Sequence, residues 1–322
     1  MRVAIDTSPL VQTAAGTARH LTGLLGALDG RPGLELVPVT FGGPGRASTV
    51  ARDALWYPVA LGRAARDADV LHCPTFRAPV RPRRPLVVTV HDLALFRHPD
   101  AFPPWHRWTG QAALRAGVRA ADVVLAVSEF TRSELGALLG VPADRVRVVP
   151  NGVDPVFAAD GPVADGDYVL AVGTLEPRKN LACAVEASRL AGVELRVVGA
   201  RGWGGVSVPG WVGRVADGEL AALMRGARCL VFPSLYEGFG LPVLEAMACG
   251  TPVVTARGGA TEEVANGAAV LVDATDPAAL ASGIVEAERR REELVRAGWD
   301  RARSYTWERA ADLVESVWRE LS

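Results

Sequence analysis

The chain has 322 residues, enough for two domains of about 150 residues each, and its 49% hydrophobic content indicates a globular protein. No apolar run reaches the roughly 18 residues of a membrane span, and the first residues lack a signal-peptide core, so we expect a cytoplasmic protein. The net charge of −1 does not indicate a nucleic-acid partner, and the four cysteines lack Cys-x-x-Cys spacing, which favours buried thiols over disulfides or zinc ligands.

β-branched runs in the first half predict strands over residues 2–7, 34–41, 68–73, 86–90 and 123–127. Helical or loop segments separate these strands, beginning with an amphipathic helix from Gly16. The alternation predicts an α/β domain with a doubly wound sheet, whose strand-to-helix loops bind ligands. Gly16 lies in the first such loop, where it is either a ligand-contacting residue or only a turn residue.

His91 and Asp92 follow the predicted strand 86–90 at its carboxyl end, where such folds place their chemistry. A single histidine is more often structural than functional, so the residues alone leave both interpretations open. Asp92 either orients the imidazole or caps the next turn.

The predicted helix over residues 103–119 combines Trp105 and Trp108 with several arginines. It is either a membrane-surface face or a helix with tryptophans in the core and a solvated basic rim. Residues 1–154 carry a net charge of +5 and the remainder −6, so the first half is the one expected to meet an anionic partner. Such a partner would contact this helix and the arginines Arg81, Arg83 and Arg84.

A second α/β domain begins with the predicted strand 168–173, and Arg178 and Lys179 follow that strand at the start of a helix. Cations there oppose the helix dipole by roughly 0.3–1 kcal/mol, which indicates an anion such as a diphosphate nearby; a solvated helix start is the alternative. Lys179 is the only lysine among 35 basic residues, which favours a site that needs a compact ammonium group.

The segment 229–250 predicts a strand, a glycine turn and a helix, and the free N–H groups at such a helix start form an anion site. Glu237 precedes the turn and Glu245 lies about one turn inside the helix, where carboxylates accept hydrogen bonds from vicinal hydroxyls. Together these features predict a pocket for a sugar attached to a nucleotide. The alternative is that Glu245 complements the helix dipole and Glu237 is a solvated loop residue.

Asp217 begins another predicted helix. It is either an N-cap or an acceptor for a guanine base, and the cap needs no ligand.

The segment 236–250 with its two glutamates resembles the signature of retaining family-4 glycosyltransferases of the GT-B fold, in particular mannosyltransferase-like members. The run from Gly173 to Asn180, with Pro177, Arg178 and Lys179, resembles the family's phosphate-binding motif. The resemblance implies two Rossmann-like doubly wound domains that face a central cleft. It places an acceptor-binding domain at residues 1–157, a nucleotide-sugar-binding domain at 158–305, and a helix crossing back to the first domain at 306–322.

For the site, the resemblance implies that His91 and Glu237 position the sugar, while Arg178 and Lys179 stabilise the diphosphate. It adds further donor-binding residues: Gly16, Asp217, Gly238, Phe239, Gly240, Leu241 and Glu245. The implied reaction moves a hexose-type sugar from a nucleoside-diphosphate sugar with retention, and it uses neither a metal nor a cofactor.

The acceptor is not identified by the sequence, and an anionic or lipid-linked acceptor is one alternative. For the location, a peripheral position of the protein at the inner membrane face is the alternative to a freely cytoplasmic one. Two other functions also stay open. One is an epimerase or hydrolase that acts on a nucleotide-sugar, and the other is a non-catalytic partner subunit that binds the donor.

Overall fold

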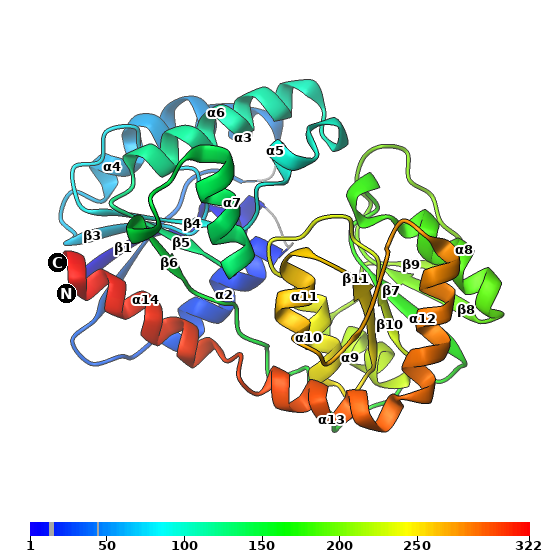
Figure 1. Cartoon of the computed structure of the whole chain (residues 1–322). Coiled ribbons are helices and arrows are strands. Elements are labelled where there is room, and N and C mark those ends of the chain that lie inside the picture. The colour runs from blue at the N-terminus through cyan, green and yellow to red at the C-terminus, as the bar shows by residue number, and fades with distance from the viewer. Residues whose placement is uncertain (13–15, 44) are drawn as a thin grey trace. The chain divides into compact units, whose positions relative to one another are not determined.

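The computed structural model describes residues 1–12, 16–43 and 45–322. It divides into two compact units, one formed by Met1–Gly152 with Thr306–Ser322 and the other by Val153–Tyr305 (Figure 1). The chain thus passes between the units after residue 152 and again after residue 305, whereas the sequence suggested a first boundary at 157/158.

The first unit contains a six-stranded parallel sheet in the order β2-β1-β3-β4-β5-β6. Its strands are β1 (Arg2–Asp6), β2 (Glu35–Val39), β3 (Val70–Cys73), β4 (Leu86–Val90), β5 (Val123–Ala126) and β6 (Val146–Val148). The central strands are buried along their whole length, as expected of apolar runs covered on both faces.

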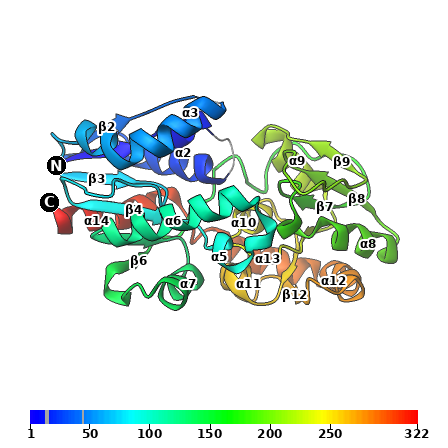
Figure 2. The ribbon, with the colours of Figure 1, turned by 90° about the horizontal axis from the view of Figure 1, so that it is seen from above.

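Helices cover both faces of this sheet (Figures 1 and 2). On one face α2 (Gly16–Leu28) and α14 (Trp307–Leu321) share a core that includes Leu21, Leu24 and Trp318. On the other face lie α3 (Arg46–Ala51), the π-helix η1 (Arg52–Ala60), α4 (Leu61–Ala64), α6 (Pro104–Ala120) and α7 (Glu129–Leu139). Short helices complete the unit: α1 (Ser8–Gln12), α5 (Ala94–Arg97), η2 (Pro99–Ala101) and η3 (Ala143–Arg145).

The second unit repeats the architecture with a parallel sheet in the order β12-β11-β10-β7-β8-β9. Its strands are β7 (Tyr168–Val172), β8 (Glu194–Val198), β9 (Trp211–Gly213), β10 (Leu230–Phe232), β11 (Val253–Ala256) and β12 (Val270–Val272). The helices are η4 (Pro177–Lys179), α8 (Leu181–Ala191), α9 (Asp217–Gly226), α10 (Leu241–Ala248), α11 (Gly259–Ala265), α12 (Pro277–Arg289) and α13 (Arg291–Ala302). The predicted doubly wound α/β class is therefore confirmed for both units.

The charged segment from Asp276 to Glu293 forms two helices, because the chain turns at Arg290. Helix α12 packs on α8, whereas α13 packs on α10, where Gly298 lies against Met247. One straight helix could not cover both neighbours. Within the described ranges, no helix combines the length and apolar content needed to span a membrane.

Two histidines are buried in the core of the first unit, where His72 Nε2 lies 2.9 Å from Thr89 Oγ1 and His20 Nδ1 lies 2.7 Å from Asn151 Oδ1. Burial lowers the pKa of each imidazole from 6.5 to about 3, and repulsion from the positive charge of a protonated His91 acts in the same direction. Both rings therefore stay neutral in the folded protein at neutral pH.

We expect Gly23→Ala and Gly26→Ala, one turn apart on α2, to have opposite effects. A Cβ at Gly23 would lie 2.1 Å from the Trp307 ring, whereas a Cβ at Gly26 would meet nothing within 4 Å. Gly23→Ala should lower the free energy of unfolding by about 1–3 kcal/mol through overpacking. Gly26→Ala should raise it by about 0.5–1 kcal/mol through helix propensity. Thermal melts check both, and equal effects would contradict the packing of α14 on α2.

The stability of the first unit should fall as the pH decreases from 6.5 towards 3. The histidines of the unfolded chain take up protons near 6.5, but the folded state resists protonation of His20 and His72 until about 3. Each ring therefore contributes stability that is present above pH 6.5 and is lost below it, by at most about 1.4 kcal/mol per pH unit. The free energy of unfolding, measured with denaturant at pH 7, 6 and 5, should fall less steeply with decreasing pH for His72→Gln than for the wild type. An equal pH dependence of the two proteins would refute the assignment.

Candidate active site

The two loops with the predicted phosphate-binding residues meet at one point of the second sheet. Strands β7 and β10 are neighbours, and the chain leaves β7 towards β8 on one side and β10 towards β11 on the other. Parallel sheets bind ligands where the connections diverge in this way. The Leu235 N–H donates to Arg178 O at 2.9 Å, which joins the loop after β10 to the loop after β7.

Glu237 is held between the two predicted cations. Lys179 Nζ lies 2.5 Å from Glu237 Oε1, and Arg178 Nη1 lies 3.1 Å from Glu237 Oε2. The three side chains are only 11–14% exposed. Burial alone would raise the pKa of Glu237, but the charges of Lys179 and Arg178 outweigh it and lower that pKa to about 2. The alternative of a solvated Glu237 is therefore wrong.

A second carboxylate completes this cluster, and the sequence reasoning missed it. Glu176 Oε1 accepts from Arg178 Nη2 at 2.6 Å, and the Glu176 side chain is 4% exposed. Burial raises the pKa of Glu176, although Arg178 and Lys179 both act to lower it. The sequence offers one signal for Glu176, which is its position beside Pro177 in the motif that contains Arg178 and Lys179. Only the fold shows that Glu176 is buried.

The start of α10 provides the glycine turn expected beside this cluster. Gly240 adopts φ 108°, a conformation open to glycine, and it precedes Leu241 without a side-chain cap. Gly238 and Phe239 are buried within the same turn, and the Phe239 ring lies 5.8 Å from that of Tyr305. The uncapped helix start therefore supplies N–H groups and a favourable dipole for an anion.

The two remaining predicted residues of the second unit differ in exposure. Glu245 is 1% exposed on α10, one turn from the helix start. Asp217 is exposed and is the first residue of α9, with Ala216 at the N-cap position. Asp217 thus lies one position later than the cap that the sequence favoured, where a carboxylate still complements the helix dipole.

In the first unit, His91 is oriented by the backbone. His91 Nε2 lies 2.9 Å from Pro74 O, and a carbonyl only accepts, so Nε2 carries the proton and Nδ1 is the acceptor of the neutral ring. Burial lowers the pKa of His91, although the hydrogen bond to the Pro74 carbonyl and the charge of Asp92 both act to raise it. Asp92 Oδ1 accepts from Ala94 N at 2.9 Å, which confirms its interpretation as a turn cap.

His20 and Asn151 support His91, and neither was proposed from the sequence. The His20 ring lies 4.8 Å from the His91 ring in an edge-to-face contact. Asn151 anchors His20 from the end of the first unit. Gly16 is the first residue of α2, but Thr13, Ala14 and Ala15 of the same expected loop lie outside the described residues.

The two units therefore present different chemistry at the carboxyl ends of their sheets. The second unit offers two cations and a helix start, which can hold an anion such as a diphosphate, beside carboxylates that can accept from hydroxyls. The first unit offers a neutral imidazole with an acceptor nitrogen. Within the described ranges, no three His, Cys, Asp or Glu side chains are grouped as metal ligands.

Comparison with known proteins matches both units to glycosyltransferase families. The model described as Glycosyltransferase Family 4 matches residues 16–157, and the model described as Glycosyl transferases group 1 matches residues 166–289. The chain is 32% identical over 288 residues to O-antigen chain mannosyltransferase B of Escherichia coli, with 79% of this chain and 75% of that protein covered.

A second curated relative is D-inositol 3-phosphate glycosyltransferase of Acidothermus cellulolyticus, 32% identical over 280 residues, with 73% of this chain covered. This chain spans 62% of that protein's length. The solved structure of Anabaena HepE in complex with UDP and glucose superimposes with a TM-score of 0.77 at 18% identity, covering 100% of both chains. That likeness shows a shared fold, and it agrees with the GT-B class expected from the sequence. The chain therefore belongs to the group 1, family 4 glycosyltransferases.

Proposed function

We propose that this glycosyltransferase moves a hexose from a nucleoside-diphosphate sugar to an acceptor hydroxyl, with retention at the anomeric carbon and without a metal ion. The observation that carries the proposal is the convergence of Arg178, Lys179 and Glu237 beside the start of α10. The donor binds the second unit and the acceptor binds the first.

The charge of the cluster suits a diphosphate. Arg178 and Lys179 are compensated by Glu176 and Glu237, so neither cation is buried without a partner. A diphosphate at the start of α10 takes over part of that role, because the helix dipole and the two cations all favour negative charge there. Glu237 then becomes available to accept hydrogen bonds from the sugar.

During transfer, the bond from the anomeric carbon to the diphosphate breaks, and the acceptor oxygen bonds to that carbon on the same face. The proton of the acceptor hydroxyl goes to the leaving diphosphate. Arg178, Lys179 and the start of α10 stabilise the charge that develops on that group. Nδ1 of His91 accepts a hydrogen bond from a sugar hydroxyl, and Glu245 accepts from the ribose.

The names of similar proteins support a hexose donor. One relative is a mannosyltransferase, and the structural neighbour was solved with UDP and glucose. A panel of UDP-, GDP- and ADP-linked glucose and mannose, screened by thermal shift, identifies the donor because a ligand that binds the folded state raises the melting temperature. Donor consumption that needs no acceptor would favour a hydrolase or epimerase, and binding without any consumption would favour a partner subunit.

Glu237→Gln should separate donor binding from turnover. The change keeps the side-chain size but removes the negative partner of Lys179 and Arg178. The variant should therefore bind the bare nucleoside diphosphate at least as tightly as the wild type does. Turnover should fall roughly 100-fold, because Glu237 acts on the group that moves in the transition state. Calorimetry and product assays measure the two effects.

Lys179→Ala and Glu245→Ala should instead each weaken binding of the bare nucleoside diphosphate by about 1–3 kcal/mol. Glu186→Gln, on the exposed face of α8, is the control and should change neither the affinity for the nucleoside diphosphate nor the turnover. If Glu237→Gln loses as much nucleotide affinity as Lys179→Ala, the assigned roles are wrong.

Activity should persist in excess EDTA, because Arg178 and Lys179 neutralise the diphosphate in the role that a divalent cation plays elsewhere. The product anomer, determined by NMR, should match that of the donor. Loss of activity that added Mg²⁺ or Mn²⁺ restores would contradict the first expectation, and an inverted anomer would contradict the second.

A further inference from the structure

The positive charge of the first unit is concentrated in one continuous part of its sequence. Residues 46–119 contain twelve arginines against five Asp and Glu, whereas the rest of this unit contains eight arginines against eleven. Ten of these twelve arginines lie in five segments: α3, η1, α4, the loop Phe76–Arg84 and α6. We refer to the surface of these five segments as the basic face.

These segments lie side by side on one side of the sheet. A Cβ at Gly62 of α4 would lie 3.7 Å from Pro79, and a Cβ at Gly117 of α6 would meet the carbonyl of Phe76. The loop Phe76–Arg84 therefore runs between α4 and α6. Figures 1 and 2 show α3, α4 and α6 on the side of the sheet opposite α14.

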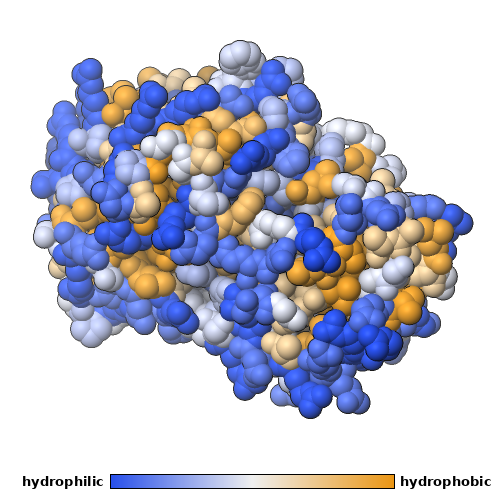
Figure 3. Space-filling view, in the orientation of Figure 1, coloured by the Kyte–Doolittle hydropathy of each residue, from blue (hydrophilic) through white to orange (hydrophobic). Residues whose placement is uncertain are grey.

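Large apolar side chains are exposed on the same segments. Trp105 and Trp108, which the sequence left as either core or surface residues, are 66% and 69% exposed on α6. Further exposed apolar residues of the basic face are Val50, Leu55, Val59 and Val80. Figure 3 shows apolar surface broken up by hydrophilic side chains along the upper edge of this unit, where Figure 1 draws α3, α4 and α6. The interpretation of α6 as a helix with core tryptophans is therefore wrong.

The carboxylates near these segments offset only part of the positive charge. Asp53 pairs with Arg77 at 2.7 Å, and Asp100 pairs with Arg107 at 3.4 Å. Helix α6 itself contains no acidic residue. Arg115 and Arg119 lie exposed on α6, and within the part of the chain that the structure describes neither forms an ion pair with a carboxylate.

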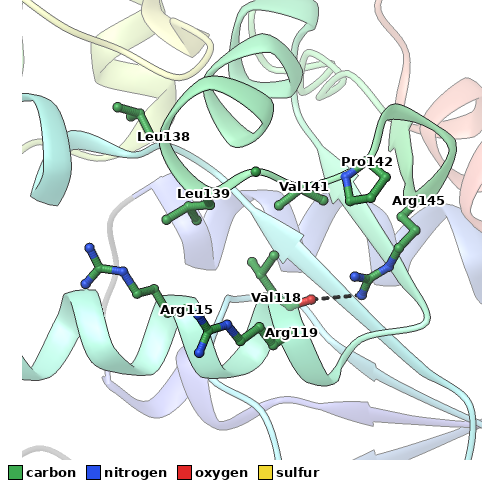
Figure 4. A pocket seen from close by; sticks show the side chains of 9 residues that line it. Arg115, Val118, Arg119, Leu138, Leu139, Val141, Pro142 and Arg145 are labelled. Atoms are coloured by element: carbon green, nitrogen blue, oxygen red, sulfur yellow. Dashed lines mark hydrogen bonds between the residues drawn. The ribbon is translucent and has the colours of Figure 1, made fainter.

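A pocket extends this surface at the far end of α6 (Figure 4). It has a volume of about 380 Å³ and lies between α6 and the end of α7. Arg115 and Arg119 line one side, and Leu138 and Leu139 line the other. Guanidinium groups beside apolar side chains suit an amphiphile with an anionic head group.

We infer that the basic face docks on the surface of an anionic lipid bilayer. Trp105 and Trp108 insert at the level of the head groups, where tryptophan partitions preferentially, and the arginines attract anionic lipids. Charge complementarity selects this occupant, because a second copy of the same face would bring like charges together. The inference does not depend on the donor chemistry proposed above.

Cosedimentation with vesicles tests the inference. The full chain should bind vesicles of phosphatidylcholine with 30 mol% phosphatidylglycerol at low salt and should stay in the supernatant with pure phosphatidylcholine. High salt should weaken binding, because salt screens the attraction between the arginines and the anionic lipids. An arginine near an anionic surface contributes about fivefold to partitioning, so Arg115→Gln with Arg119→Gln should reduce the partition coefficient about 30-fold. Trp105→Ser with Trp108→Ser should also reduce it.

The matched control is Arg189→Gln with Arg289→Gln, which removes the same charge from exposed helices of the second unit. This pair should leave binding unchanged, and circular dichroism should show that all variants are folded. Equal losses for both arginine pairs, or binding that ignores lipid charge, would overturn the inference. The inference would also be overturned if the wild type formed a dimer in sedimentation equilibrium, the tryptophan variant were monomeric, and the wild type did not bind vesicles. The basic face would then join two copies of the chain.

Discussion

The candidate site depends on the ion pairs that Glu237 forms with Lys179 and Arg178. These charges are largely buried, and removing one partner of such a cluster leaves another charge uncompensated, which typically costs about 3–5 kcal/mol. The pairs, with the backbone bond from Leu235 to Arg178, hold the loops after β7 and β10 in one arrangement. Cations held in a fixed orientation suit an anionic ligand, because fewer side chains have to be ordered when the ligand binds.

The two units use the same sheet geometry for different chemistry. In each, loops after parallel strands gather the candidate side chains at the carboxyl edge of the sheet. The second unit places charges there, which suits phosphate. The first unit places His91 against a backbone carbonyl with His20 behind it, and both rings are kept neutral by burial. A neutral imidazole can accept a hydrogen bond from a hydroxyl group without adding charge to the first unit.

The sequence predicts which residues form the charged cluster around Glu237 better than it predicts the contacts among them. Arg178, Lys179 and Glu237 can each be recognised in the sequence, because a cation at a helix start and a carboxylate before a glycine turn are local signals. The family resemblance implies contact of Glu237 with the sugar alone, and the sequence does not predict its pairing with Lys179, 58 positions away. Glu176, His20 and Asn151 were missed for the same reason: their importance comes from burial beside residues distant in the chain.

The sequence by itself determined the α/β class, the positions of most strands and the glycosyltransferase motifs, because periodicity, turn residues and motif spacing are properties of short segments. Only the tertiary structure decided the order of the strands, the break between α12 and α13, the partners of Glu237 and the exposure of Trp105 and Trp108. Each of these depends on which surface a segment packs against. An amphipathic pattern shows that a helix has two faces, but the neighbours that cover one face are fixed only when the whole domain has folded.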